Sequence, residues 1–237
     1  MLKIKNFTKT YGEKRAVDSL NLCIERGEIC GFIGHNGAGK TTTLKACMGI
    51  LSFDEGDILI DGMSIKERPL DCKRVTAYIP DNPELYSYLT GAKYLAFVAD
   101  VYGVSQEKRS ELISTYAEKF GITADLGSLI GTYSHGMKQK LAIIAAWIHS
   151  PKLIIMDEPF VGLDPKASHH LKEMMREHCD NAGSIFFSTH VLDVAEKLCD
   201  KVAIIKKGKL VVTGAMDEVR GNDSLEEVFL ELEESDD

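Results

Sequence analysis

A glycine-rich segment, Gly34–Thr41, constrains the fold of this chain more than any other part of its sequence. Its residues read Gly-His-Asn-Gly-Ala-Gly-Lys-Thr and fit the pattern G-x-x-x-x-G-K-[ST] of a phosphate-binding loop. An apolar run predicted as a strand, Ile29–Ile33, precedes it, and a helix pattern from Lys40 to near Gly49 follows it. In such a unit, backbone N–H groups surround phosphate oxygens and the helix N-terminus adds positive charge. The alternative is a glycine-rich turn that only lets the helix and strand pack closely.

The loop predicts an ATP site with its own cation and its own Mg²⁺ ligand. We expect Lys40 to reach the β- and γ-phosphates and the Thr41 hydroxyl to bind Mg²⁺. The residues expected to contact ATP in this segment are Gly34, His35, Asn36, Gly37, Ala38, Gly39, Lys40, Thr41 and Thr42.

A second acidic motif follows the apolar run Leu153–Met156, which we predict to be a buried strand. Carboxylates at the carboxyl end of a parallel strand point into the ligand crevice of an α/β sheet. Asp157 is therefore placed to hold Mg²⁺, and Glu158 to act as the general base toward an attacking water. The alternative is that both are solvated acids at a strand end.

The composition limits the classes of protein to consider. The chain has 237 residues and a formal net charge of −8, which argues against nucleic acid as a partner. Its six cysteines show no metal-ligand spacing, so we expect reduced thiols. No stretch approaches the roughly 20 apolar residues that span a bilayer. If the protein works at a membrane, another chain must anchor it.

The periodicity of the sequence predicts one α/β core interrupted by helices. Strands are expected at 2–4, 20–24, 29–33, 58–60, 75–79, 153–156, 185–188, 202–205 and 209–213, and helices at 90–102, 105–120, 134–149, 166–179 and 191–199. Thr90, Ser105 and Ser134 are the candidate N-caps of the middle helices. The catalytic core would comprise 1–84 and 151–222, the helical insertion 85–150, and a short acidic helix or tail 223–237.

With both motifs located, the chain resembles the nucleotide-binding subunit of ATP-binding-cassette (ABC) transporters over essentially its full length. The segment 133–139, Tyr-Ser-His-Gly-Met-Lys-Gln, resembles the family's signature motif Leu-Ser-Gly-Gly-Gln, with Ser134 and Gly136 in agreement. The segments 162–164 and 188–190 resemble the D-loop and the switch histidine. Tyr11 matches the aromatic residue on which adenine stacks.

The resemblance implies a cassette fold, namely a phosphate-loop core with a mixed sheet and an inserted helical subdomain. It also implies two subunits that close head to tail over two ATP–Mg²⁺, the second being another copy or a paralogue. Ser134 and Gly136 would cover the ATP held by the partner, and His190 would stabilise the γ-phosphate or the water. Transport, with export favoured by the Ser-His-Gly-Met-Lys-Gln form, would need a separate integral membrane subunit at the cytoplasmic face of the cell membrane.

Two of the departures from the family pattern bear on the expected site. Asp81 stands after Tyr78-Ile79-Pro80, where the family has a Gln that contacts Mg²⁺. An Asp can bind Mg²⁺ too, so Asp81 is a tentative metal ligand, and the alternative is a solvated acid. His135 stands where the family usually has Gly, and it either contacts nucleotide or lies on the surface.

Two other functions remain open from the sequence. The first is a soluble cassette ATPase that acts on DNA or ribosomes without a membrane partner. The insertion is too short for the coiled coils of chromosome-maintenance members, and translation-factor members carry two cassettes. The second is a non-enzymatic nucleotide-gated module, against which Glu158 and His190 argue. The transported substrate is not encoded here, because the membrane subunit would select it.

Overall fold

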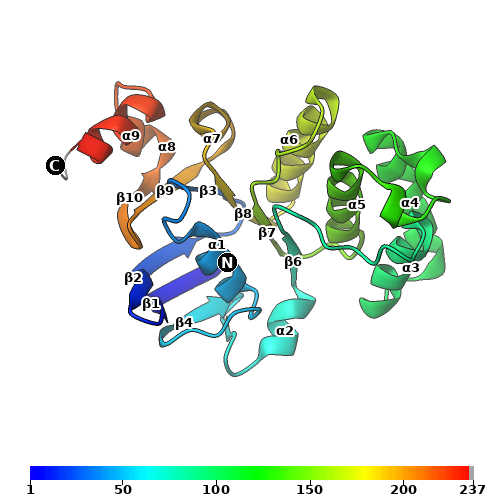
Figure 1. Ribbon diagram of the computed structural model, residues 1–237, viewed down its shortest axis with the longest axis horizontal. Coiled ribbons are helices and arrows are strands. Elements are labelled where there is room, and N and C mark those ends of the chain that lie inside the picture. Colours follow the sequence, from blue (N-terminus) through cyan, green and yellow to red (C-terminus); the bar gives the residue numbers. More distant parts are fainter. Residues whose placement is uncertain (235–237) are drawn as a thin grey trace.

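Short apolar segments form a six-stranded sheet at the centre of the molecule, of which the computed structural model describes residues 1–234 (Figure 1). Its strands lie in the order β10-β9-β3-β8-β7-β6. They are β3 (Ile29–Ile33), β6 (Thr76–Ile79), β7 (Leu153–Asp157), β8 (Ser184–Thr189), β9 (Lys201–Lys206) and β10 (Lys209–Ala215). All pairs are parallel except β9 with β10, so the sheet is mixed, as the sequence predicted. Strands β3, β7 and β8 are buried throughout, as continuous apolar runs in parallel sheets are.

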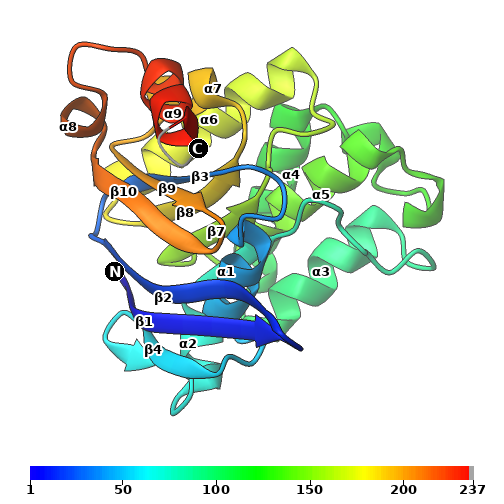
Figure 2. The ribbon, with the colours of Figure 1, turned by 60° about the vertical axis from the view of Figure 1, so that its left-hand side comes forward.

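A second sheet of four antiparallel strands lies beside the first, in the order β2-β1-β4-β5 (Figure 2). Its strands are β1 (Leu2–Tyr11), β2 (Lys14–Ile24), β4 (Glu55–Ile60) and β5 (Met63–Ser64). The predicted strands covered only the apolar ends of β1, β2 and β4. Their polar halves carry no strong pattern, because cross-strand backbone pairing rather than burial holds them in place.

The six-stranded sheet separates two hydrophobic clusters. Cys30 and Phe32 of β3 face helix α1 (Lys40–Cys47) and the four-stranded sheet. Ile29 and Ile33 of the same strand face the opposite side. Buried side chains there come from helices α5 (His135–Ile148), α6 (Pro165–Asp180) and α7 (Leu192–Leu198). The alternation follows from the two-residue period of a strand, and it fixes β3 and α1 in the middle of the molecule.

The helical region consists of α3 (Gly91–Val101), α4 (Gln106–Phe120) and α5 (His135–Ile148), drawn in green in Figure 1. The three predicted N-caps are confirmed, since Thr90, Ser105 and Ser134 each accept a hydrogen bond from the backbone N–H three residues on. Short 3₁₀ turns, Thr123–Asp125 and Ile130–Thr132, join α4 to α5. Helix α5 shares its buried cluster with the sheet, so this region is joined to the core by continuous packing.

The last third of the chain alternates strands and helices as predicted, with α6 (Pro165–Asp180) and α7 (Leu192–Leu198). The predicted C-terminal helix is α9 (Leu225–Glu234), while residues 235–237 of the expected tail lie outside the described residues. The sequence analysis missed α2 (Pro69–Arg74) and α8 (Met216–Arg220), which are too short to show a helical period. Over residues 1–234, no helix has the length and apolar character needed to cross a bilayer.

Gly56, near the start of β4, offers a test of how tightly the second sheet is built. Its φ is +88°, and a Cβ at this position would lie 2.3 Å from the Lys5 carbonyl oxygen. Gly62 is the matched control, because its φ is +80° but a Cβ there would have no atom of the described residues within 4 Å. We expect Gly56→Ala to lower the free energy of unfolding by about 1–3 kcal/mol more than Gly62→Ala, since only Gly56 adds a clash to the left-handed strain. Urea unfolding measures both losses, and equal values would contradict this account.

Candidate functional site

The phosphate-binding loop connects β3 to α1, and its glycines are required by close packing. A Cβ on Gly34 would lie 2.4 Å from the Ile205 carbonyl oxygen, and one on Gly39 would lie 2.7 Å from that of Ala16. Gly39 also caps α1 with a φ of +113°, which favours glycine. The loop is thus held between β9 and β2, and its shape is set before any ligand binds.

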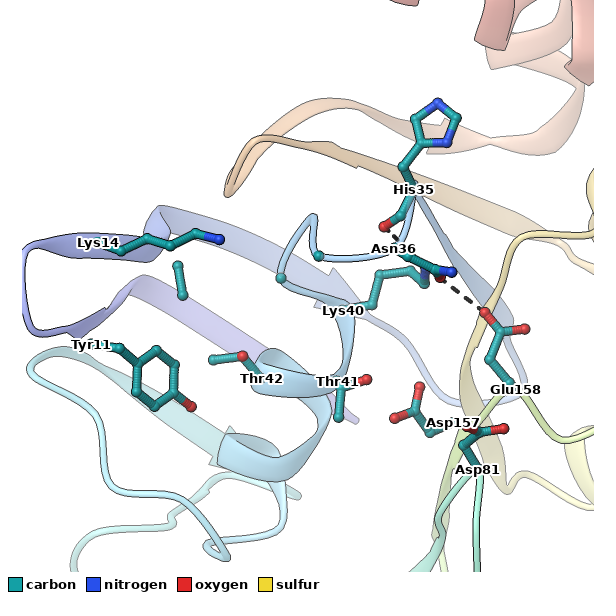
Figure 3. A pocket seen from close by; sticks show the side chains of 13 residues that line it. Tyr11, Lys14, His35, Asn36, Lys40, Thr41, Thr42, Asp81, Asp157 and Glu158 are labelled. Carbon is teal, nitrogen blue, oxygen red and sulfur yellow. Dashed lines mark hydrogen bonds and ion pairs between the residues drawn. The ribbon is translucent and has the colours of Figure 1, made fainter.

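A pocket of about 350 Å³ opens beside this loop (Figure 3). Its lining residues are Tyr11, Lys14, Ala16, His35, Asn36, Gly37, Gly39, Lys40, Thr41, Thr42, Asp81, Asp157 and Glu158. Most of the predicted ATP and metal contacts therefore meet at one place. Gly34 and Ala38 shape the loop without lining the pocket, and Ala38 is buried.

Lys40 is the cation at the base of the pocket, and only 6% of it is exposed. Its Nζ donates hydrogen bonds to the carbonyl oxygens of Gly34 at 2.5 Å and His35 at 3.4 Å. The same Nζ lies 3.8 Å from Glu158 Oε1. Burial lowers the pKa of Lys40, and the charges of Glu158 and Asp157 oppose that shift. The lysine is thus held inside the loop, facing both carboxylates.

Asp157 and Glu158 follow one another at the end of β7 but have different surroundings. Asp157 is 3% exposed, and its Oδ1 accepts a 2.5 Å hydrogen bond from Ser188 Oγ. The same hydroxyl accepts a hydrogen bond from the backbone N–H of Glu158 at 3.0 Å. Ser188 lies opposite Asp157 on β8, and the sequence analysis gave it no separate role. This buried serine joins the two acidic residues.

Glu158 contacts His190, which lies 32 positions further along the sequence on another segment. His190 Nδ1 lies 3.0 Å from Glu158 Oε2, although the histidine does not line the pocket itself. Parallel pairing of β7 with β8 brings the two residues together, because each follows the carboxyl end of its strand. The two residues expected to act on the attacking water are therefore neighbours in the structure.

Asp81, two residues after the end of β6, lines the same pocket as Asp157 (Figure 3). Nearby, burial raises the pKa of Tyr78, with smaller contributions from the negative charges of Asp157 and Asp81. Asp81 is exposed, whereas Asp157 is buried. Asp81, the tentative metal ligand, thus lines the pocket and is open to solvent.

Tyr11 and Lys14 lie on the far side of the pocket, at the hairpin between β1 and β2 (Figure 3), and Ala16 of β2 also lines the pocket. Tyr11 is 49% exposed, and Lys9 Nζ lies 5.3 Å from its ring centroid. Sequence reasoning missed Lys14 and Ala16. The available signal was their position three and five residues after Tyr11, the residue expected to stack on adenine.

His35 contributes to the pocket from its place in the loop, while its ring points away from Lys40 (Figure 3). The ring packs edge-on against Phe229 of α9, with centroids 5.1 Å apart. This contact connects the phosphate-binding loop to the C-terminal helix.

Ser134 and Gly136 do not line the pocket of their own chain. Ser134 is exposed at the N-terminus of α5 and accepts a hydrogen bond from the Met137 N–H at 3.3 Å. Gly136 packs on the segment after β7, where a Cβ would lie 2.5 Å from the Gly162 carbonyl oxygen. His135 is exposed and lies against Gly162. Close packing within the chain is thus one reason for glycine at 136.

A phosphate-binding loop and two strand-end carboxylates, all at the carboxyl ends of parallel strands, define a phosphate-loop nucleoside triphosphatase. The chain belongs to the ABC transporter family, whose model matches residues 17–161. It is the ATP-binding subunit of an ABC transporter, has the cassette fold, and hydrolyses ATP to power transport.

Individual relatives agree with this assignment. The chain is 34% identical to the ABC-type transporter ATP-binding protein EcsA of Bacillus subtilis (strain 168), over 100% of this chain and 98% of EcsA. It is 33% identical to the linearmycin resistance ATP-binding protein LnrL of the same organism, over 90% of this chain and 69% of LnrL. A solved structure of the ATP binding subunit of an ABC transporter superposes with a TM-score of 0.94 and 35% identity, covering 98% of this chain and 99% of that one.

Proposed function

We propose that this chain pairs head to tail with a second cassette subunit over two ATP–Mg²⁺ and drives export through a separate integral membrane subunit, at the cytoplasmic face of the membrane. The observation that carries the proposal is the position of Ser134 relative to the pocket. The phosphate-binding loop, Asp157 and Glu158 share a pocket, while Ser134 is exposed outside it. A second chain that presents its own Ser134 would complete the site.

The pocket residues fit a magnesium ion bound together with ATP. The Thr41 hydroxyl and the carboxylates of Asp157 and Asp81 line one pocket, and Mg²⁺ prefers such oxygen ligands (Figure 3). Within residues 1–234, no three His, Cys, Asp or Glu side chains converge on a metal cage. Mg²⁺ typically binds through one or two carboxylates together with substrate phosphates, so a cage is not required. When bound, the ion would neutralise charge on the phosphoryl oxygens.

The remaining steps belong to side chains of this chain. Lys40 places a positive charge beside the phosphates, where its burial strengthens the interaction. Glu158 accepts the proton of the attacking water, and His190 orients that carboxylate through the 3.0 Å contact or stabilises the γ-phosphate. Closure by the second subunit excludes solvent from these groups.

Glu158→Gln tests the proposed base. The change keeps the size of the side chain and removes its basicity, so ATP binding should persist while steady-state turnover falls by about 10²-fold or more. Glu107→Gln, at the exposed start of α4, is the control and should keep wild-type turnover. Turnover of Glu158→Gln equal to that of wild type would exclude the base role.

Ser134→Arg tests the composite site. The arginine adds bulk and charge where the partner's ATP would dock, so it should spare ATP binding by the monomer and abolish dimer formation and hydrolysis. Ser105→Arg is matched, because Ser105 is an exposed N-cap of α4 with the same hydrogen bond. Both variants lose about 1 kcal/mol of cap stabilisation, but only Ser134→Arg should lose the dimer in sedimentation. Wild-type hydrolysis by Ser134→Arg would rule out the head-to-tail arrangement.

Asp81 takes the place of the glutamine expected on the metal side of the pocket. If its carboxylate binds Mg²⁺, Asp81→Ala should raise the Mg²⁺ concentration needed for half-maximal ATPase activity, because one oxygen ligand is lost. Asp81→Gln should need less Mg²⁺ than Asp81→Ala, since its carbonyl oxygen restores a ligand. ATPase rates against Mg²⁺ concentration decide the question, and three superimposable curves would make Asp81 a bystander.

An exposed aromatic cluster further along the segment that follows Asp81 supports a membrane subunit as the partner. Tyr86, Tyr88 and Phe97 are 47%, 72% and 46% exposed, and the Tyr86 ring lies within 6.0 Å of both others. Exposed aromatic side chains that gather in this way mark protein interfaces. Tyr86 and Tyr88 lie on the connection between β6 and α3 that also carries Asp81, so a docked subunit would contact the same segment that reaches the pocket. Export is supported by the similarity to LnrL, which is named for linearmycin resistance.

A further inference from the structure

Glu158 has a backbone conformation that its own sequence does not favour. Its φ is +46°, in the left-handed region, which is costly for a residue with a Cβ. Pro159 follows, and a proline favours extended backbone in the residue before it. Such a residue keeps its conformation only when neighbouring groups hold it. The position of the Glu158 carboxylate therefore depends on contacts from other elements.

Two side chains hold this turn, one on each side of Glu158. At the start of the turn, Ser188 Oγ accepts a hydrogen bond from the Glu158 N–H at 3.0 Å. At the end of the turn, Gln139 Nε2 donates a hydrogen bond to the Pro159 carbonyl oxygen at 3.4 Å. Ser188 belongs to β8 of the sheet, whereas Gln139 belongs to α5 of the helical region. The turn is thus tied to both parts of the molecule.

Gln139 is placed at some cost to stability. Its exposure is 0%, and the buried residues that follow it on α5, 141–148, are all apolar. Its Oε1 is buried without a hydrogen-bond partner among the described residues, which is unfavourable. Rotating the amide would not help, because Oε1 would then face the Pro159 oxygen. A buried amide with an unpaired oxygen calls for a reason other than stability, and a role in function is one such reason.

Further contacts tie the same segment to the start of α5. Lys140 Nζ lies 2.6 Å from Asp164 Oδ2, and this lysine is the main cause of the lowered pKa of Asp164. His135 and Gly136 both lie against Gly162. The segment 158–164 is therefore held against the first turns of α5, the helix whose N-terminus carries Ser134.

We propose that Gln139 is a positioning residue for Glu158, which holds the Glu158–Pro159 turn against the helix that bears Ser134. This inference rests on the proposed function, in which Glu158 is the base and Ser134 covers the partner's ATP. The helix end that docks on the partner is then linked, through Gln139, to the base of its own site. Docking at one ATP site and water activation at the other become mechanically coupled within a single chain.

Gln139→Met is the direct test, measured on the whole protein. It keeps the length of the side chain and removes the donor to Pro159. We expect kcat to fall by about ten- to a hundredfold, because a small displacement of a catalytic group has effects of this size. The KM for ATP should stay at its wild-type value, since the phosphate-binding loop is on other elements. The Tm should change little, because the change removes one unpaired carbonyl oxygen and creates another.

A second variant and a control separate positioning from mere stability. Gln139→Asn keeps a buried amide that is one methylene too short to reach Pro159, so it should show the same fall in kcat at an unchanged KM. Ile143→Ala, one turn further along α5, removes a fully buried apolar side chain. It should lower the Tm and leave kcat at its wild-type value below the unfolding transition.

The outcomes are distinct. Wild-type kcat in both Gln139 variants would overturn the proposal. So would a loss of kcat in Ile143→Ala as large as in the Gln139 variants, because packing alone would then explain it. Glu158→Gln is assayed in parallel: if it keeps its turnover, the base role fails, whereas a loss in Glu158→Gln with normal Gln139 variants refutes only the positioning role.

Discussion

Parallel pairing of β3, β8, β7 and β6 is the constraint on which the rest of the structure depends. Because these strands run in one direction, their carboxyl ends meet at a single edge of the sheet. The phosphate-binding loop follows β3, and Asp81 follows β6. Asp157 is the last residue of β7 and Glu158 comes directly after it, while His190 comes directly after β8. Four segments that are distant in the sequence thus meet at one site, and the burial of both sheet faces makes this arrangement rigid.

Charge is distributed unevenly around that pocket. Lys40 is buried at its base opposite Asp157 and Glu158, while Lys14 lines the far side with Tyr11. Buried charges interact strongly because little water screens them. Ser188 adds a second constraint, since its hydroxyl joins the Asp157 carboxylate to the Glu158 backbone. The acids therefore have fixed positions before a phosphate reaches them, which is the preorganisation that phosphoryl transfer requires.

Much of this could be predicted from sequence, because the relevant signals are local. The spacing within Gly34–Thr41 encodes a loop whose glycines the structure shows to be sterically required. Runs such as 153–156 identify buried parallel strands, and Ser134 is recognisable as an N-cap. In contrast, the polar halves of β1 and β2 and the short helices α2 and α8 were missed, because cross-strand pairing and packing rather than periodic burial stabilise them.

The sequence by itself determined the class of fold, the phosphate-binding loop and the pair of acids. The loop and the acids each occupy one short run of consecutive residues, so a local pattern identifies them. Only the tertiary structure decided which distant residues join them. The register of β7 against β8 places Ser188 beside Asp157, and it brings His190, which the family resemblance had implied at the site, into contact with Glu158. The second sheet brings Lys14 to the far side of the pocket. The packing of α5 sets Gln139 on Pro159. These contacts depend on how separate elements dock, and no single segment carries that information.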